Sequence, residues 1–157
     1  MPIPVENIVG DGEEDTKLLK EMVVAARNYI SSFEWSQPIT AMYFAYGIGG
    51  ILALFLVEFA GKIAGTDSRL WVIVGDLPPA YMIVEPDSCA QNILESYCSY
   101  MDEWVEAVKG NGDFSGVYPV AAPRTLENAE MLRSRLEFIR REIIPDAPTD
   151  LVGEPAR

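Results

Sequence analysis

The sequence predicts an α+β fold: a four-stranded antiparallel sheet with one helix before it and two helices after it, the helices lying mainly on one face. Three observations predict this fold. An apolar, aromatic and β-branched block, broken by Gly, Pro and Asp, runs from Ile39 to Val84. The segments on either side carry apolar residues at helical spacing. The connections inside the block are too short for a parallel crossover, which needs about a dozen residues or more.

The composition is that of a globular chain with a strong acidic excess. The 157 residues include 12 Lys and Arg against 24 Asp and Glu, for a net charge of −12. Such a field repels phosphate backbones and anionic lipid and attracts basic partners. We therefore expect a basic protein partner, no nucleic acid and no membrane. The chain has no His, which excludes Ser-His-Asp catalysis and His-ligated zinc. We predict no metal and no cofactor.

The length predicts a single domain over residues 13–145, with a flexible lead-in over residues 1–12 and a flexible tail over residues 146–157. The start of the chain is acidic and has no apolar segment of the kind that a secretory signal requires. Cys89 and Cys98 would lie about 13 Å apart along a shared helix, whereas a disulfide needs Cα atoms within about 7 Å. We expect free thiols and a cytoplasmic location.

The first helix begins at Glu13, where acidic residues oppose the positive end of the helix dipole. It should end near residues 34–36, before Pro38. Its buried stripe has spacings of three and four and consists of Leu19, Met22, Val23, Ala26, Ile30 and Phe33.

The central block predicts four strands: residues 39–46, 51–60, 70–74 and 80–84. The glycines between the first two suit a tight turn, because they tolerate positive φ. One alternative stays open here, since Ile39–Val57 carries no charge and is almost long enough to span a membrane. The strands are continuously apolar, which predicts that both faces of the sheet are covered. The sequence therefore also allows a homodimer or a partner on the second face.

Two further helices follow the block. Ser88 is the predicted N-cap of the first, with Gln91 in capping-box position and a buried stripe that continues to Val108. The glycines after this helix end it. Pro123 and Thr125 open the last helix, and Pro145 stops it.

Three segments together carry a family resemblance: LWVIVGDLPPAY at residues 70–81, SYMDEWVEAV at residues 99–108, and PRTLENAEMLRSRLEFIRREIIP at residues 123–145. The chain resembles a family of small acidic bacterial proteins of unassigned function, in which a strand ending GDLPPAY precedes a helix like DEWVEAV. The resemblance covers roughly the last two thirds of the chain. It implies no catalytic residue. By analogy with other small acidic proteins, it implies a partner-binding role like that of an immunity protein or antitoxin.

The first candidate site is an acidic stripe on the second helix. Glu95, Asp102 and Glu106 fall within about 40° of one another on a helical wheel, and Glu103 lies nearby. No Lys or Arg occurs between residues 87 and 108. An uncompensated stripe of this kind is suited to a basic partner, and the plainer interpretation is an ordinary solvated face. If it binds a partner, charge reversal there should weaken binding without unfolding the protein.

The second candidate site is the turn of the GDLPPAY motif, where Asp76, Pro78, Pro79 and Tyr81 would form a rigid loop. The plainer interpretation is a simple chain reversal. With the acidic stripe, this turn predicts a non-catalytic module that binds a basic protein and neutralises or regulates it.

The alternative function belongs to another class. Glu58 is a lone carboxylate in an apolar run, and with Tyr46, Trp71 and Asp76 it predicts an aromatic-lined pocket. Such a pocket would serve a small-ligand-binding protein or a carboxylate-dependent enzyme. The sequence leaves open the identity of the partner or ligand.

Overall fold

The computed structural model describes residues 2–63, 68–110 and 112–152. The chain divides into two compact units, whereas the sequence predicted one domain over residues 13–145. The first, which we call the sheet unit, consists of Met1–Ala90 together with Pro148–Arg157. The second, the helical unit, consists of Gln91–Ala147 and is therefore inserted between two parts of the first.

The sheet has five strands in the order β1-β2-β3-β4-β5, and every neighbouring pair is antiparallel. The four predicted strands are confirmed as β2 (Ile39–Ile48), β3 (Leu52–Phe59), β4 (Arg69–Gly75) and β5 (Ala80–Ile83). The fifth strand, β1 (Ile3–Pro4), was not predicted. It is only two residues long and contains a proline, so it has no strand pattern of its own. It forms because it pairs with the edge of β2.

The Gly-rich segment between β2 and β3 forms the predicted tight turn. Ile51 donates its N–H to the carbonyl of Ile48 at 3.0 Å, and Gly50 has a φ of +79°. The alternative of a membrane span over Ile39–Val57 is wrong, because this segment forms β2, the turn and most of β3. Among the described residues, no helix has both the length and the apolar character needed to cross a bilayer.

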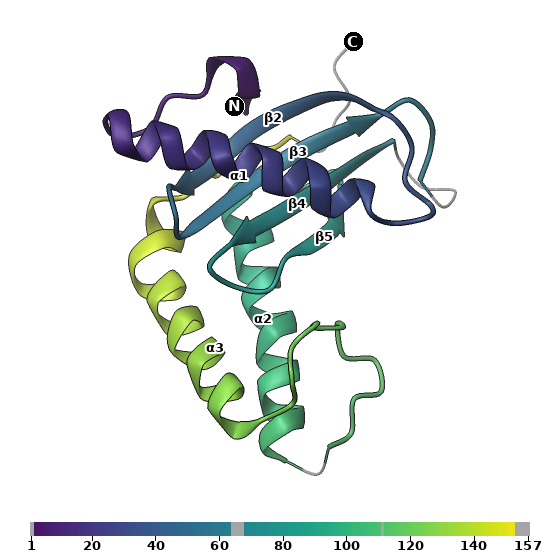
Figure 1. Ribbon diagram of the computed structural model, residues 1–157, viewed down its shortest axis with the longest axis vertical. Coiled ribbons are helices and arrows are strands. Elements are labelled where there is room, and N and C mark those ends of the chain that lie inside the picture. The colour runs from purple at the N-terminus through teal and green to yellow at the C-terminus, as the bar shows by residue number, and fades with distance from the viewer. Residues whose placement is uncertain (1, 64–67, 111, 153–157) are drawn as a thin grey trace. The chain divides into compact units, whose positions relative to one another are not determined.

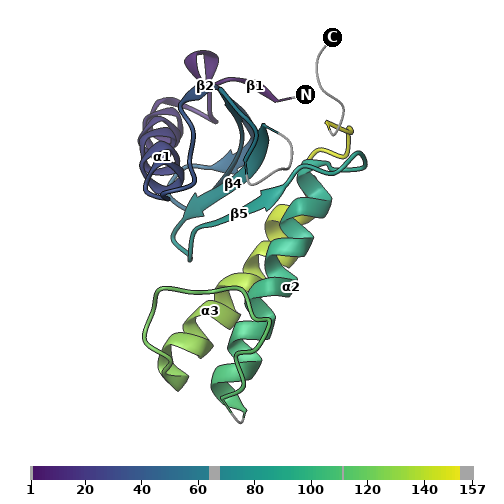
Figure 2. The ribbon, with the colours of Figure 1, turned by 90° about the vertical axis from the view of Figure 1, so that its right-hand side faces the viewer.

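Helix α1 (Glu13–Ser31) lies across one face of the sheet (Figures 1 and 2). Its predicted stripe is confirmed, and it ends a few residues earlier than expected, where Ser32 donates its N–H and hydroxyl to the carbonyl of Tyr29. The core beneath α1 combines this stripe with alternate residues of β3 and β4. Its buried members from these three elements are Leu19, Met22, Ala26, Ile30, Ala53, Phe55, Val57, Phe59, Leu70, Val72 and Val74.

The N-terminal end of α1 is tied to the turn between β2 and β3 by one carboxylate. Asp15 accepts the N–H of Gly49 at 2.6 Å with one oxygen and the N–H of Asp11 at 2.7 Å with the other. Thr16 adds a second tie, since its hydroxyl accepts from the N–H of Gly10 at 2.8 Å. Asp15 therefore fixes where α1 begins relative to the sheet.

Replacing Asp15 by asparagine should destabilise the protein by about 1 to 2 kcal/mol, because the amide can present only one acceptor to two N–H donors. The shift in the urea unfolding midpoint measures this loss. Glu14→Gln is the control, because it removes a charge from the same exposed turn. Equal shifts in the two variants would show that charge alone, and not the double acceptor, matters at this position.

The second face of the sheet is buried within the chain. Leu54, Trp71 and Ile73 of this face are each 0% exposed, and the expected homodimer stays a prediction. Part of the cover is the segment after the helical unit: Val152 donates its N–H to the carbonyl of Ser88 at 2.9 Å, and its carbonyl accepts from Nη1 of Arg69 at 3.1 Å. The tail expected over residues 146–157 thus contains a buried residue of the sheet unit.

The lead-in expected over residues 1–12 also contains ordered structure. It holds β1, the short 3-10 turn η1 (Val5–Asn7) and Ile8, which is 2% exposed and belongs to the core beneath α1. This segment is rich in Pro and Gly, and its composition therefore predicts a loop. A single buried residue such as Ile8 cannot be recognised from that composition.

The helical unit is built from α2 (Ala90–Lys109) and α3 (Leu126–Phe138), which lie side by side (Figures 1 and 2). Thr125 caps α3 by accepting the N–H of Asn128 at 3.1 Å. The chain then continues through the π-helical turn η2 (Ile139–Ile143) and the 3-10 turn η3 (Ile144–Asp146), where Pro145 stops it as predicted.

The prediction that Ser88 caps α2 is wrong. The helix begins at Ala90, and the Ser88 hydroxyl instead accepts the N–H of Glu85 at 2.8 Å. Gln91 does not close a capping box either, because its amide donates to the carbonyl of Ile144 at 3.0 Å. In the described part of the chain, the core beneath α1 consists of residues of the sheet unit.

Candidate functional site

An open groove of about 520 Å³ lies between α1 and the turn that joins β4 to β5. We call it the α1–turn groove. One wall is a stripe along α1, and the other is formed by the turn. Its lining residues are Leu18, Glu21, Met22, Ala25, Tyr29, Gly50, Val74, Gly75, Asp76, Leu77 and Pro79.

The α1–turn groove includes part of the GDLPP turn that the sequence singled out. Asp76 and Pro79 line it, while Pro78 and Tyr81 do not. The turn is rigid at its base, where Asp76 donates its N–H to the carbonyl of Ile51 at 3.0 Å. The charged residues that line the groove, Glu21 and Asp76, are both acidic, and most of the remaining lining is apolar.

Four aromatic rings adjoin one end of the α1–turn groove. Tyr29 lines the groove and makes an edge contact with Phe33, with ring centroids 5.3 Å apart. Phe33 stacks on Trp35 at 4.9 Å, and Tyr81 lies 5.2 Å from Phe33 and 5.0 Å from Trp35. We call these four residues the aromatic cluster. Tyr81 of the predicted site therefore belongs to the cluster and not to the groove.

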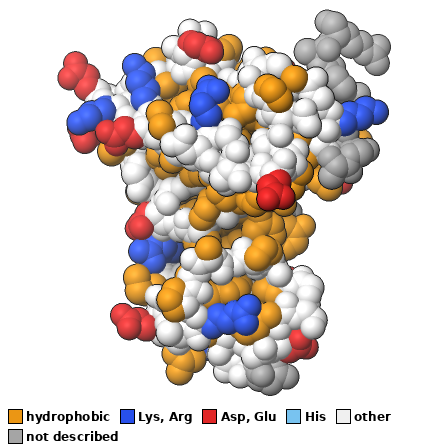
Figure 3. Space-filling model, turned by 45° about the vertical axis from the view of Figure 1, so that its right-hand side comes forward, with side chains coloured by type: hydrophobic (Ala, Val, Ile, Leu, Met, Phe, Trp, Pro, Cys, Tyr) orange, Lys and Arg blue, Asp and Glu red, His pale blue; other side chains and the backbone are white. Residues whose placement is uncertain are grey.

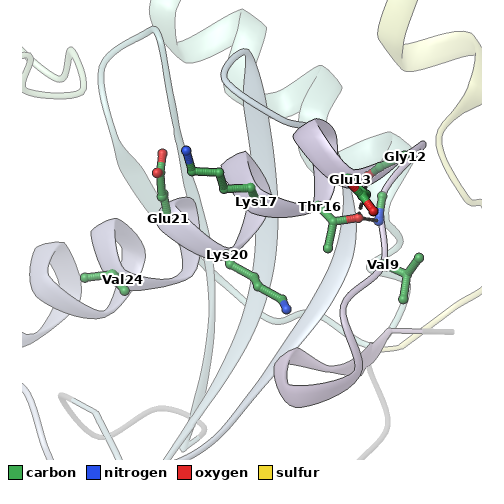
Figure 4. A pocket seen from close by; sticks show the side chains of 9 residues that line it. Val9, Gly12, Glu13, Thr16, Lys17, Lys20, Glu21 and Val24 are labelled. Carbon is green, nitrogen blue, oxygen red and sulfur yellow. Dashed lines mark hydrogen bonds between the residues drawn. The ribbon is translucent and has the colours of Figure 1, made fainter.

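A second open groove, of about 760 Å³, follows another side of α1 (Figure 4). Its charged lining residues are two lysines, Lys17 and Lys20, and two glutamates, Glu13 and Glu21. The opposite charges balance on this surface, and Glu21 lines both this groove and the α1–turn groove.

The predicted acidic stripe on α2 is only partly uncompensated. Asp102 forms an ion pair with Arg140, at 2.5 Å between Oδ2 and Nη2. Glu95, Glu103 and Glu106 are exposed, as predicted. The sequence could not show the ion pair, because Arg140 follows Asp102 by 38 residues. On the face that Figure 3 shows, some acidic side chains gather beside Lys or Arg and others lie apart from one another.

Arg133 and Arg141 also have local acidic partners. Arg133 lies 3.5 Å from Glu130 and 3.6 Å from Glu137, and Arg141 lies 3.0 Å from Glu142. These exposed pairs contribute little to stability.

Neither cysteine forms a disulfide, and both are buried. Burial raises the pKa of the Cys98 thiol to about 11, against the small opposing effect of Arg140, while the charges of Asp102 and Glu95 add to the rise. Since the thiolate is the reactive form, Cys98 is a packing residue and not a nucleophile.

This pKa predicts a loss of stability in alkali. Between pH 9 and pH 11 the unfolded thiol releases its proton while the folded thiol of Cys98 keeps it. The free energy of unfolding should therefore fall as pH rises, by up to about 1.4 kcal/mol per pH unit. Urea unfolding of wild type and Cys98→Ala across this range measures the effect, because only the wild type has the cysteine contribution. Parallel pH profiles would contradict the assignment.

The alternative pocket is not assembled. The strand register places Glu58 opposite Arg69 at one end of the β3–β4 pair and Asp76 just beyond the other end, where Gly75 faces Leu52. These two carboxylates are therefore about 20 Å apart along the strands, too far to act on one bond. In the described part of the chain, no three acidic or cysteine side chains gather in a way that could hold a metal ion.

The two aromatic residues of the alternative pocket lie on the same sheet face as Glu58. A bulge between Phe44 and Tyr46 turns Tyr46 to the second face, opposite Leu54. Trp71 is 0% exposed and lines a cavity of about 10 Å³, which neither Tyr46 nor Glu58 lines. Such a space holds about one water molecule. Nε1 of Trp71 has no hydrogen-bond partner among the described residues.

The groove wall on α1 is what sequence analysis missed. Leu18, Ala25 and Tyr29 recur at spacings of seven and four beside Met22, which already belongs to the predicted buried stripe. Together the two stripes make the apolar face of α1 wider than coverage of the sheet needs. That width was the available indication of a second, exposed apolar surface.

Comparison of the chain with models of protein families, with curated proteins and with solved structures finds no match. The resemblance to small acidic bacterial proteins of unassigned function stays a prediction. The function proposed below is therefore inferred from the geometry of the chain.

Proposed function

We propose that this protein is a non-catalytic binding module that neutralises or regulates a basic protein of the cytoplasm, in the manner of an immunity protein. One observation carries the proposal: the α1–turn groove has mainly apolar walls, and its charged lining residues, Glu21 and Asp76, are both carboxylates. A segment of the partner with apolar side chains and flanking Lys or Arg would complement this surface.

The two parts of the surface have different physical roles. Burial of apolar side chains against Met22, Ala25 and Leu77 supplies binding free energy of about 25 cal/mol per Å² before ordering costs. The carboxylates, at the edge of an open groove, mainly increase the association rate and the preference for basic partners. The net charge of −12 adds long-range steering to both.

The test begins with affinity purification of the tagged protein from its own lysate at low and high salt. The affinity of the purified partner is then measured for two variants with equal changes in net charge. Glu21→Lys with Asp76→Lys changes the groove, and Glu95→Lys with Glu106→Lys changes the exposed stripe on α2. We leave Asp102 unchanged, since its replacement would also break the ion pair with Arg140.

We expect the groove variant to lose about 100-fold or more in affinity and the α2 variant to lose only a few-fold. The opposite order would move the binding surface to α2. Equal losses would show that the net charge of the protein, and not either surface, determines the affinity. Unchanged affinity in both variants would contradict the proposal. Circular dichroism of each variant confirms that it is folded.

A further inference from the structure

The aromatic cluster extends the α1–turn groove beyond its charged lining. Tyr29 belongs to both surfaces, because it lines the groove and its ring contacts Phe33. All four aromatic residues pack against the core beneath α1 and are only partly buried, so each keeps some solvent-accessible surface. A partner segment that leaves the groove at Tyr29 therefore meets ring faces and edges.

The rings are packed on one another and do not form an empty cage. Phe33, Trp35 and Tyr81 have mutual centroid distances of 4.9, 5.0 and 5.2 Å, which leave no space between them for a ligand group. A ligand can contact this cluster only from outside, over an exposed ring face. That geometry suits a flat group better than a bulky one.

The segments that carry Phe33, Trp35 and Tyr81 are acidic in sequence. Glu34, between Phe33 and Trp35, is exposed, and residues 28–36 contain no Lys or Arg. The segment that carries Tyr81, residues 76–87, contains three acidic residues and again no Lys or Arg. A cation over these rings would gain from the ring quadrupoles and from the nearby carboxylates.

We propose that the aromatic cluster receives an arginine side chain of the basic partner, with the guanidinium lying over an exposed ring face. This inference rests on the proposed function, since it names the side chain that accompanies the apolar residues held in the groove. Arginine fits better than lysine, because its guanidinium is planar, weakly hydrated and able to stack. The chain itself shows such a contact, where Arg124 lies over the ring of Phe114 at 3.8 Å.

The length of the groove wall on α1 also limits the distance between the apolar residues and the arginine in the partner. From Leu18 to Tyr29 the helix rises about 16 Å, which equals about five residues of an extended chain. The partner segment should therefore carry its apolar residues within about five extended residues of the arginine.

The test uses a synthetic peptide of twelve residues that alternates leucine and arginine. Trp35 is the natural reporter, because Trp71 and Trp104 are 0% and 2% exposed and their fluorescence should respond little to a surface ligand. Calorimetry gives the affinity for variants without Trp35. Trp35→Leu removes the ring and keeps an apolar side chain, while Trp35→Phe keeps a ring. Tyr100→Leu is the matched control, since Tyr100 is an exposed aromatic residue of the helical unit that stacks on Tyr118.

We expect Trp35→Leu to weaken peptide binding about three- to tenfold, Trp35→Phe to keep most of the affinity, and Tyr100→Leu to change it less than twofold. Absence of binding to the wild type, or equal losses in Trp35→Leu and Trp35→Phe, would overturn the arginine site. If Trp35→Leu keeps full affinity while Glu21→Lys with Asp76→Lys loses it, the aromatic site is rejected and the proposed function stands. If neither variant loses affinity, both are rejected.

Discussion

Replacing Gly75 by alanine should destabilise the protein by about 3 to 5 kcal/mol, which combines backbone strain with a steric clash. Gly75 has a φ of +154°, a conformation that residues with a side chain rarely adopt. An added Cβ would lie within 3 Å of three backbone atoms at the start of β3, closest to the carbonyl oxygen of Ile51. That oxygen cannot move freely, because it accepts the N–H of Asp76 at 3.0 Å.

Gly112→Ala is the matched control for this prediction. Gly112 has a φ of +77°, but a Cβ there would meet no atom within 4 Å. It should therefore show the cost of conformation alone, about 1 kcal/mol. Chemical unfolding of both variants measures the difference, and for a chain of this size the larger loss corresponds to a fall in Tm of about 10 °C. Similar losses in the two variants would show that the clash at Gly75 is relieved by small shifts.

Replacing Arg69 by methionine should cost about 2 to 3 kcal/mol, the usual contribution of a hydrogen bond that involves a charged group in a buried place. Arg69 is 6% exposed, and its Nη1 donates to the carbonyl of Val152 at 3.1 Å. Methionine fills the space of the side-chain stem but leaves that carbonyl without this donor. The segment around Val152 should then detach more often from the sheet unit.

Two measurements check the Arg69 prediction. Urea unfolding gives the loss of stability, and limited proteolysis under native conditions gives the rate of cleavage between Pro148 and Val152. Arg27→Met is the control, because Arg27 is exposed on α1 and its replacement should change stability by less than about 0.5 kcal/mol. If Arg69→Met loses stability without faster cleavage in this segment, the guanidinium stabilises the sheet by some other contact.

Elements with a strong local pattern could be predicted from the sequence. Strands β2 to β5 follow from apolar runs separated by Gly and Pro, and the buried stripe of α1 follows from its spacing. Strand β1 could not be predicted, because two residues have no periodicity and the pairing with Phe44 creates the strand. The prediction of the α2 cap was wrong for a related reason. Ser88 has a side chain suited to capping, but its hydroxyl accepts the N–H of Glu85 instead.

The candidate site depends on contacts between distant residues, and sequence analysis found only half of it. Asp76 and Pro79 were predicted from the turn motif, whereas Glu21 was not, because nothing local places α1 beside that turn. Asp102 was misjudged because its partner Arg140 lies on another helix. Tyr46 and Trp71 share a sheet face only because a bulge in β2 shifts the register, and such a bulge leaves no mark in the composition.

The insertion of the helical unit sets an order of events during synthesis. The last residue before it, Ala90, and the first after it, Pro148, line the same small cavity, so the chain leaves the sheet unit and returns to it at one place. Strands β1 to β5 are all made before the ribosome starts the insertion, yet the donor on Arg69 meets its acceptor on Val152 only 83 residues later. At a synthesis rate of about 5 to 20 residues per second, Val152 is made on the order of 10 s after Arg69. Until then the guanidinium of Arg69 lacks this acceptor. A nascent chain stalled inside α2 should therefore lack the cover that Val152 gives to Arg69 and Trp71.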